Sequence, residues 1–267
     1  SLDTATVAGG CLSPAARVRT AAGDLAFLKW DEPGTAAGMF VEEARALEAI
    51  RGTWTVRVPA VIAVEEGKGT GRGTGKGGGW EERPRGRGEV VGEEGVGGER
   101  ASGGSGGSGD YAWILLEWLE PGPSSKAMWE RLGRELAALH RVRAERYGWT
   151  SDNFIGSLPQ ENGWMDDWAV FWRERRLEPQ LRLAYDAGWF EAPDRHRFDA
   201  LLDRLDELLA PAAADGPSLL HGDLWSGNVH VMANGKAALI DPASYYGHRE
   251  VDLAMADLFG GFERHET

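Results

Sequence analysis

Residues 218–243, SLLHGDLWSGNVHVMANGKAALIDPA, decide how the rest of this chain is interpreted. Two short apolar runs in this stretch, at 229–232 and 237–240, flank the residues Ala-Asn-Gly-Lys. An Asn-Gly pair between apolar runs is a strong signal for a β-hairpin, because both residues tolerate the positive φ that a tight turn requires. We therefore predict a hairpin here, with polar residues at both of its ends.

The polar residues at the ends of this hairpin have the spacing that phosphoryl transfer requires. His221, Asp223 and Asn228 precede it in the pattern H-x-D-x-x-x-x-N. Asp241 follows it. In kinases, a loop of the form H-R-D-L-x-x-x-N supplies an aspartate that accepts the proton of the attacking hydroxyl, while the asparagine and a later aspartate hold magnesium. We interpret Asp223 as the catalytic base, and Asn228 and Asp241 as the metal ligands.

The amino-acid sequences of these motifs resemble those of one family. LLHGDLWSGN, DPASYYGHRE and LFGGF are similar to segments of the fructosamine kinase (ketosamine 3-kinase) family. The related aminoglycoside and choline kinases share the HGD and the later Asp, but not Leu-Trp-Ser-Gly. The resemblance covers residues 1–64 and 111–267, and it implies an α+β fold of the bilobal protein-kinase-like type, with ATP and Mg²⁺ as cofactors. The implied reaction is phosphorylation of the 3-hydroxyl of a ribulosamine or fructosamine, free or protein-bound, after which the sugar is lost and the amine is repaired.

The resemblance also implies two lobes of unequal size. Residues 1–120 would form a small, β-rich, nucleotide-binding N-lobe. Residues 121–267 would form a larger, mainly helical C-lobe that carries the catalytic loop and the metal site. Because members of the family continue for several further helices, we expect this C-lobe to be incomplete at its C-terminal end.

A glycine-rich tract at 67–109 interrupts the N-lobe. It contains 19 of the 38 glycines of the chain and almost no apolar side chains. Such a segment cannot bury enough apolar surface to offset the entropy of ordering it. We therefore expect a disordered insertion.

The composition excludes several classes of protein. The chain has 267 residues and a net charge of −13, and its Lys and Arg residues form no patch, which argues against a nucleic-acid partner. A single cysteine excludes an internal disulfide framework and suits a reducing compartment. No apolar run approaches the roughly 18 residues of a membrane span. We expect a cytoplasmic enzyme without membrane contact; organellar targeting stays open, because the sequence begins at Ser1 without a methionine.

A lysine and a glutamate near the N-terminus fit the nucleotide site of a kinase. Lys29 lies in the apolar run 26–30, where a lone lysine is otherwise a surface residue. Residues 36–50 have the periodicity of a helix, and Glu43 shares its apolar stripe. A carboxylate on that face needs a cationic partner, so we predict a Lys29–Glu43 ion pair like that of kinases. Glu42 is the rival partner.

Residues 1–30 are interpreted as a β-hairpin or meander that includes Gly9 and Gly10. Glycine pairs mark ordinary turns more often than phosphate loops. VAGGCLS nevertheless resembles the nucleotide-covering loop of the family, so Gly9 and Gly10 are expected to bind nucleotide. Cys11 stands beside them, and the resemblance implies a redox-dependent homodimer through this cysteine. The alternative is that it behaves as a small hydrophobic residue.

Residues 111–119 form an apolar run that predicts a buried strand. In the kinase-like fold that the resemblance implies, this strand leads to the connection between the lobes. The backbone of Glu117 and Leu119 would there meet the adenine. Ser124 or Ser125 is then predicted to cap a helix.

The segment 147–168 is rich in Trp, Asp and Asn. Such residues suit a sugar site, because aromatic rings stack on apolar sugar faces and carboxylates bind hydroxyls. An aromatic-packed connection is the alternative. Trp225, beside the predicted base, is interpreted as a substrate residue. Helical patterns occupy 167–187, with an interruption near Pro179, and 195–210.

Other polar residues belong to the surroundings of the predicted catalytic loop. Asp252, in the last helical pattern, is expected to fix this loop from behind. His140 lies on the stripe of a helix and is interpreted as a core or interlobe histidine. For His248 and Arg249, substrate contact and a structural role both stay open.

Three alternatives stand beside a ketosamine kinase. A polar turn would explain the HGD alone. A kinase of the same fold could act on an aminoglycoside or an amino alcohol, although the ring of Trp225 favours a sugar. An inactive regulatory module needs no complete set of catalytic residues, whereas all five expected polar residues are present: Lys29, Glu43, Asp223, Asn228 and Asp241.

Overall fold

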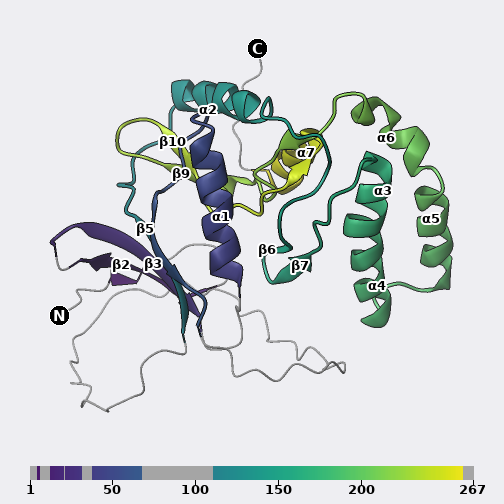
Figure 1. The fold of residues 1–267 in the computed structure, drawn as a ribbon, viewed down its shortest axis with the longest axis horizontal. Coiled ribbons are helices and arrows are strands. Elements are labelled where there is room, and N and C mark those ends of the chain that lie inside the picture. Colours follow the sequence, from purple (N-terminus) through teal and green to yellow (C-terminus); the bar gives the residue numbers. More distant parts are fainter. Residues whose placement is uncertain (1–4, 7–12, 21, 32–37, 68–110, 261–267) are drawn as a thin grey trace.

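The chain folds into two lobes (Figure 1). Residues of both lobes line one cavity. In the computed structural model the described residues are 5–6, 13–20, 22–31, 38–67 and 111–260. The smaller lobe consists of a sheet and one helix, and the larger lobe is mainly helical with short hairpins. This is the α+β, two-lobed arrangement that we predicted.

The loop that contains Gly9, Gly10 and Cys11 lies outside the described residues, as do residues 68–109 of the glycine-rich tract. The described chain stops two residues after the fourth strand of the sheet and resumes one residue before the fifth. Nucleotide binding by the two glycines, dimer formation through Cys11 and disorder of the tract therefore stay predictions.

The N-lobe is built on one antiparallel sheet with the strand order β1-β2-β3-β5-β4. Its strands are β1 (Ala5–Thr6), β2 (Ala15–Arg19), β3 (Leu25–Asp31), β4 (Val61–Glu65) and β5 (Ala112–Glu117). Buried and half-buried residues alternate along β5, as expected for a strand with one face on the core. The first three strands confirm the predicted meander, and β5 lies within the strand predicted at 111–119.

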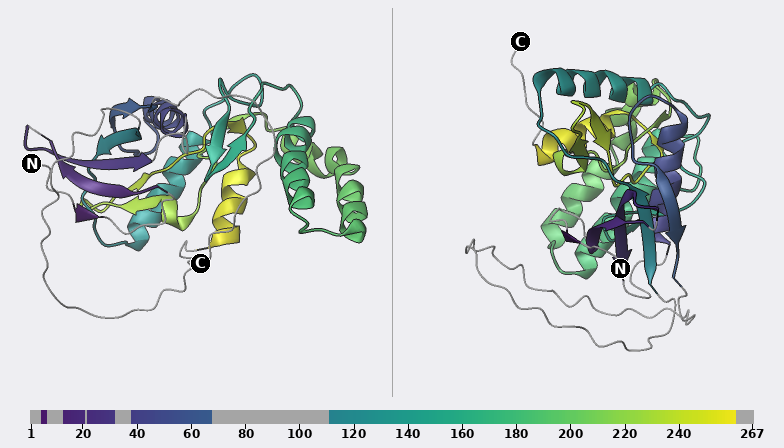
Figure 2. Two further views of the ribbon diagram at one scale, coloured as in Figure 1. Left: turned by 90° about the horizontal axis from the view of Figure 1, so that it is seen from below. Right: turned by 90° about the vertical axis from the view of Figure 1, so that its left-hand side faces the viewer.

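Helix α1 (Met39–Gly52) packs across one face of this sheet (Figures 1 and 2). Its apolar stripe is buried, with none of these residues more than 4% exposed: Phe40, Ala44, Leu47 and Ile50. Burial of such a stripe supplies most of the stability of a short helix. The helix confirms the pattern predicted at 36–50, and it places Glu43 on the side that faces the sheet.

The C-lobe is mainly helical. Its helices are α2 (Lys126–Leu139), α3 (Trp168–Trp172), α4 (Glu178–Asp186), α5 (Ala192–Leu202), α6 (Leu205–Ala213) and α7 (Glu250–Phe259). Ser125 caps α2, because its hydroxyl accepts the Met128 N–H at 3.2 Å. The interruption predicted near Pro179 is a π-helical segment, Arg173–Leu177, between α3 and α4. Pro179 itself lies in the first turn of α4, where its missing N–H breaks no helical bond.

The single helix predicted at 195–210 is wrong, because the chain forms α5 and α6 there. Arg204, between them, has φ −105° and ψ 2°, which lie outside the helical region. The leucines before and after this break keep a helical spacing, so the periodicity of the sequence does not reveal it.

Short antiparallel strand pairs complete the C-lobe. They are β6 (Asn153–Ile155) with β7 (Leu158–Gln160), β8 (Ser218–Leu219) with β11 (Tyr246–Gly247), and β9 (Val229–Val231) with β10 (Ala237–Leu239). The pair β9–β10 is the hairpin predicted from Asn-Gly. Gly235 has φ 72° in its turn, a value that glycine adopts without steric cost.

One cluster of buried apolar residues extends through both lobes, from α1 and β5 to α2 and the hairpin β9–β10. The Leu239 N–H of this hairpin donates to the Arg57 carbonyl of the N-lobe at 2.8 Å, so backbone and core both join the lobes. In the part of the chain that the structure describes, no helix has the length and apolar character needed to cross a membrane.

Candidate active site

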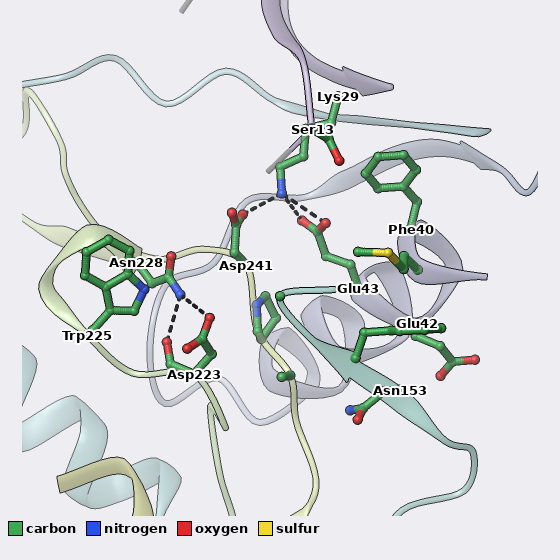
Figure 3. A pocket seen from close by; sticks show the side chains of 15 residues that line it. Ser13, Lys29, Phe40, Glu42, Glu43, Asn153, Asp223, Trp225, Asn228 and Asp241 are labelled. Carbon is green, nitrogen blue, oxygen red and sulfur yellow. Dashed lines mark hydrogen bonds and ion pairs between the residues drawn. The ribbon is translucent and has the colours of Figure 1, made fainter. Parts of the chain in front are cut away.

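Strand β3, helix α1 and the end of the hairpin β9–β10 bring three charged side chains together (Figure 3). Lys29 Nζ lies 2.8 Å from Glu43 Oε1 and 2.6 Å from Asp241 Oδ1. Lys29 is 3% exposed, so water screens these ion pairs poorly. Burial raises the pKa of the Glu43 carboxyl more than the Lys29 ammonium lowers it. The predicted Lys29–Glu43 pair is therefore present, and phosphate binding by Lys29 stays a prediction.

Glu42, the rival partner of Lys29, is engaged elsewhere. Its carboxylate accepts a hydrogen bond from the Ser151 hydroxyl at 2.5 Å and pairs with Arg45. Neighbouring residues on a helix point about 100° apart, so Glu42 and Glu43 face different surroundings. Glu42 lines the same cavity as Lys29, which the sequence patterns did not predict.

Asp223 and Asn228 meet at the other end of the site. The Asn228 amide nitrogen donates to the Asp223 carbonyl at 2.8 Å and to Asp223 Oδ2 at 3.0 Å. Burial raises the pKa of the Asp223 carboxyl, and the carboxylates of Asp241 and Asp252 add to that shift. A carboxylate with a raised pKa is a stronger proton acceptor when it is ionised.

Asp252 in α7 holds the loop that contains Asp223 from behind, as predicted. Its two oxygens accept the backbone N–H groups of His221 and Gly222, each at 2.9 Å. His140 Nε2 lies 2.9 Å from Asp252 Oδ2, which makes this histidine part of the support, as its core position suggested. Gly222 has φ 85°, and a Cβ on it would lie 2.1 Å from the Ala243 carbonyl oxygen. A side chain such as the arginine of H-R-D therefore does not fit here.

The question left open for His248 and Arg249 has a structural answer. His248 is 3% exposed and its Nε2 lies 3.2 Å from Asp215 Oδ2. Arg249 pairs with the same oxygen at 2.7 Å. The hydrogen bond with His248 lowers the pKa of the Asp215 carboxyl. Neither residue lines the cavity that contains Asp223.

A cavity of about 260 Å³ contains the groups predicted to carry chemistry. Its lining comes from both lobes: Ser13, Lys29, Met39, Phe40, Glu42, Glu43, Asn153, Phe154, Gly156, Asp223, Trp225, Asn228, Asp241, Pro242 and Ala243. The structure therefore brings all five expected polar residues to one place, with Trp225 beside them (Figure 3). The indole of Trp225 covers Gly227, where a Cβ would lie 2.3 Å from the ring.

Two residues predicted to bind nucleotide lie outside this cavity. Glu117 ends β5, and its carboxylate pairs with Arg57 and accepts the Ala60 N–H at 3.0 Å. The Leu119 carbonyl lies 2.9 Å from His230 Nε2. Both residues belong to the connection between the lobes, and adenine contact through their backbone stays a prediction.

The segment 147–168 divides between the cavity and the core, so aromatic packing is present and sugar binding stays a prediction. Asn153 and Phe154 in the hairpin β6–β7 line the cavity. Trp149 is instead buried, with its ring 5.7 Å from that of Tyr246. Composition alone could not separate the two groups, because both are polar or aromatic residues in one connection.

The donor set fits a magnesium ion that is held jointly with nucleotide phosphates. Because the amide nitrogen of Asn228 donates to Asp223, its amide oxygen is left for a cation. Asp241 has φ 55°, a value that is uncommon outside glycine and that residues of functional sites often adopt. Among the residues described, no group of three His, Cys, Asp or Glu side chains could hold a metal. Mg²⁺ commonly takes one or two carboxylates and completes its shell with substrate phosphates and water.

Comparison with known proteins finds a matching family and several relatives. A sequence model of the family described as fructosamine kinase matches residues 2–73 and 97–265, so the unmatched residues 74–96 fall inside the glycine-rich tract. A probable ketoamine kinase of Synechocystis sp. is 37% identical over 226 residues, which cover 84% of this chain and 61% of that protein. The chloroplastic protein-ribulosamine 3-kinase of Arabidopsis thaliana is 33% identical over 253 residues, which cover 94% of this chain and 64% of that protein.

A solved structure confirms the predicted fold. The "putative fructosamine-3-kinase" of Thermobifida fusca superposes with a TM-score of 0.72 at 30% sequence identity, covering 97% of this chain and 75% of that chain. The chain spans less than two thirds of the length of these two curated relatives.

Proposed function

This chain belongs to the fructosamine kinase family, and we propose that it transfers the γ-phosphate of ATP to the 3-hydroxyl of a ketosamine. A ribulosamine or a fructosamine, free or on a protein, is the proposed substrate. The observation that carries this proposal is one cavity with Asp223 at one end and the paired Lys29 and Asp241 at the other. A proton acceptor and a cation for phosphate thus stand on either side of one reaction space.

Asp223 performs the proton transfer in this proposal. Its carboxylate accepts the proton of the sugar hydroxyl while the hydroxyl oxygen bonds to the γ-phosphorus. The bond from that phosphorus to the β–γ bridging oxygen breaks, and ADP leaves. The hydrogen bond from Asn228 holds Asp223 Oδ2 in place, so the other carboxylate oxygen is available to the substrate.

The N-lobe residues bind the nucleotide. Lys29 contacts the phosphates, and Glu43 keeps its ammonium group in the cavity. Asp241 and Asn228 hold Mg²⁺, which neutralises phosphate charge when it is bound. The buried position of these groups strengthens their interaction with an anionic ligand.

Trp225 and Asn153 contact the sugar in this proposal. A half-buried indole beside the base suits stacking on a sugar ring, and the Asn153 amide suits a hydroxyl. The ribulosamine in the name of the Arabidopsis relative supports this class of substrate. Phosphorylation at the 3-position would make the sugar labile, so the overall outcome is deglycation of an amine.

A phosphate-transfer assay tests the proposal. The protein is incubated with Mg-ATP and a synthetic ribulosamine, a fructosamine or an aminoglycoside, and the phosphorylated position is read by ³¹P and ¹H NMR. We expect phosphate on the 3-hydroxyl of the ketosamines. Transfer to the aminoglycoside in their place would establish the alternative kinase, and ATP turnover with none of them would contradict the substrate class.

We further propose a cytoplasmic location, with the chloroplast named for the Arabidopsis relative as the alternative that cell fractionation would test. A redox-dependent homodimer through Cys11 also stays a proposal, supported by the resemblance of its loop to that of the family. Non-reducing electrophoresis of the wild type and Cys11→Ser, before and after thiol reduction, would show whether Cys11 joins two chains.

A further inference from the structure

A hairpin of the C-lobe contacts helix α1 of the N-lobe. The hairpin β6–β7 lies beside the N-terminal half of α1 (Figure 1). Ser151, two residues before β6, donates its hydroxyl hydrogen to Glu42 Oε2 at 2.5 Å, and Glu42 stands in the first turn of α1. The side chain of Glu42 is 12% exposed, so water competes poorly for this charge-assisted hydrogen bond.

Two neighbouring glutamates thus attach α1 in two directions. Glu43 pairs with Lys29 in the sheet, and Glu42 bonds to Ser151 in the C-lobe. Both glutamates lie in the N-terminal half of one short helix, and a helix moves as a unit. A shift of this end of α1 away from Ser151 would therefore change the distance between Glu43 and Lys29.

The hairpin is itself held by a buried polar network. Asp152 accepts the Asn162 N–H at 2.7 Å, and the Asn162 amide donates to Asn153 Oδ1 at 2.8 Å. Arg176 in the π-helical segment donates to Asn162 Oδ1 at 2.6 Å, and its guanidinium lies 4.1 Å from the ring centre of Tyr245. Asn162 is fully buried. The hydrogen bonds of this buried network restrict the hairpin to one arrangement, and π-helical turns frequently occur at functional sites.

The network ends at the residues that follow Asp241. The Asn153 amide donates to the Ser244 carbonyl at 2.9 Å, three residues beyond Asp241. Asp241 in turn pairs with Lys29. The contacts therefore close a ring around the cavity, from Lys29 along α1 to the hairpin and back to Asp241.

From this ring we infer that Ser151 and Glu42 are positioning residues, which hold α1 where Glu43 meets Lys29. The effect that we expect on the KM for ATP rests on the proposed function, whereas the position of α1 rests on these contacts alone. A C-lobe residue, Ser151, thereby helps to position Glu43 against Lys29 in the N-lobe. The geometry of this ion pair then depends on how the two lobes are placed.

The test is the chemical reactivity of Lys29. Ser151→Ala removes the donor, and Ser151→Thr keeps a hydroxyl. An amine-reactive acylating reagent is added without nucleotide, and mass spectrometry compares the acylation rate of buried Lys29 with that of exposed Lys236. We expect Ser151→Ala to raise the relative rate at Lys29 about tenfold, the scale of one hydrogen bond to a charged group. Ser151→Thr should stay within about threefold of the wild type.

Kinetic measurements and control variants accompany this test. Ser151→Ala should raise the KM for ATP about tenfold while the KM for the ketosamine changes less than about twofold. Glu42→Gln keeps an acceptor oxygen and should have a smaller effect than Glu42→Ala. Two exposed neighbours, Thr150→Ala and Glu48→Gln, should behave as the wild type.

The outcomes separate this inference from the proposed function. Wild-type acylation of Lys29 in Ser151→Ala overturns the inference, even if that variant melts at a lower temperature. Faster acylation of Lys29 in a protein that phosphorylates no ketosamine supports the inference and contradicts the proposed function.

Discussion

The two ends of the cavity differ in how they hold their carboxylates. At the N-lobe end, Lys29 lies between Glu43 and Asp241, so one ammonium group is shared by two carboxylates. At the C-lobe end, Asp223 receives a neutral donor from Asn228 and forms no ion pair with any residue that the structure describes. Burial raises the pKa of Asp223 more than His221 and Asn228 lower it, which suits the proposed proton transfer, whereas Asp241 is proposed to bind a cation. The neighbours of a carboxylate, rather than its residue type, assign its role.

The largest effect should come from removing the proton acceptor. Asp223→Asn keeps the shape of the side chain and can keep a contact with Asn228, but it cannot accept the proton. We expect turnover to fall by roughly 10²–10⁴-fold, the usual contribution of a positioned general base. ADP formation in the presence of a ketosamine measures this, with the exposed Asp203→Asn as the control. Turnover near the wild-type rate would remove Asp223 from the role of base.

Asp241→Ala should act through the other end of the cavity. It removes the carboxylate proposed to hold Mg²⁺ and leaves the ion pair between Lys29 and Glu43 in place. We expect activity to fall by about a hundredfold and the Mg²⁺ concentration for half-maximal activity to rise. A magnesium titration of the reaction rate measures both. An unchanged magnesium dependence would show that Asp241 does not bind the ion.

The loop that contains Asp223 is held by hydrogen bonds to the Asp252 carboxylate, and their loss should reduce the stability of the fold. Asp252→Asn replaces one acceptor oxygen by an N–H₂ group, which then faces a backbone N–H of His221 or Gly222. Loss of one buried hydrogen bond to a charged acceptor costs about 1.5–3 kcal/mol. Urea unfolding should show this loss in the free energy of unfolding. The same substitution at the exposed Asp199 should leave the free energy unchanged.

The raised pKa of Asp223 predicts a pH dependence of stability with a definite sign. Because the folded protein binds the proton of Asp223 more tightly than the unfolded chain does, the carboxylate destabilises the fold above that pKa. Asp223→Asn should therefore melt at a higher temperature than the wild type at pH 7. This difference should shrink as the pH falls through the raised pKa and the wild-type carboxyl becomes neutral. A difference that grows on acidification would contradict the assignment.

The smallest effect should follow deletion of the glycine-rich tract. Replacing residues 67–109 by a short turn between β4 and β5 changes the loop-closure entropy by only about 0.6 kcal/mol for each doubling of length. We expect the melting temperature to stay equal or rise slightly, and the protein to keep its phosphate-transfer activity. Clear destabilisation would show that the tract packs against the N-lobe.

The parts of the site that the sequence predicts are those encoded over short distances. Asp223, Asn228 and Asp241 flank one hairpin. Its Asn-Gly turn reverses the chain and brings Asp241 back beside Asn228. Glu43 is predictable for another reason. A carboxylate on the apolar face of a helix requires a cation, and Lys29 stands in a neighbouring strand.

Contacts between distant residues have no such local pattern. Ser151 bonds to Glu42 over 109 positions, Asn153 to Ser244 over 91, and Lys29 to Asp241 over 212. The first and the last depend on how the two lobes meet, and the Asn153–Ser244 contact depends on packing within the C-lobe. Neither periodicity nor turn residues determine such packing. The missed break between α5 and α6 has a related cause, because an apolar period can continue across two helices that share one face.

The affinity for Mg-ATP of two variants, measured by isothermal titration calorimetry, tests most directly whether the two ends of the cavity have separate roles. Asp223→Asn should bind Mg-ATP within about threefold of the wild type, since a general base contributes to the transition state rather than to nucleotide binding. Asp241→Ala should bind at least about tenfold more weakly, because it loses a carboxylate for the metal. Equal weakening in both variants, or wild-type affinity in Asp241→Ala, would contradict this division.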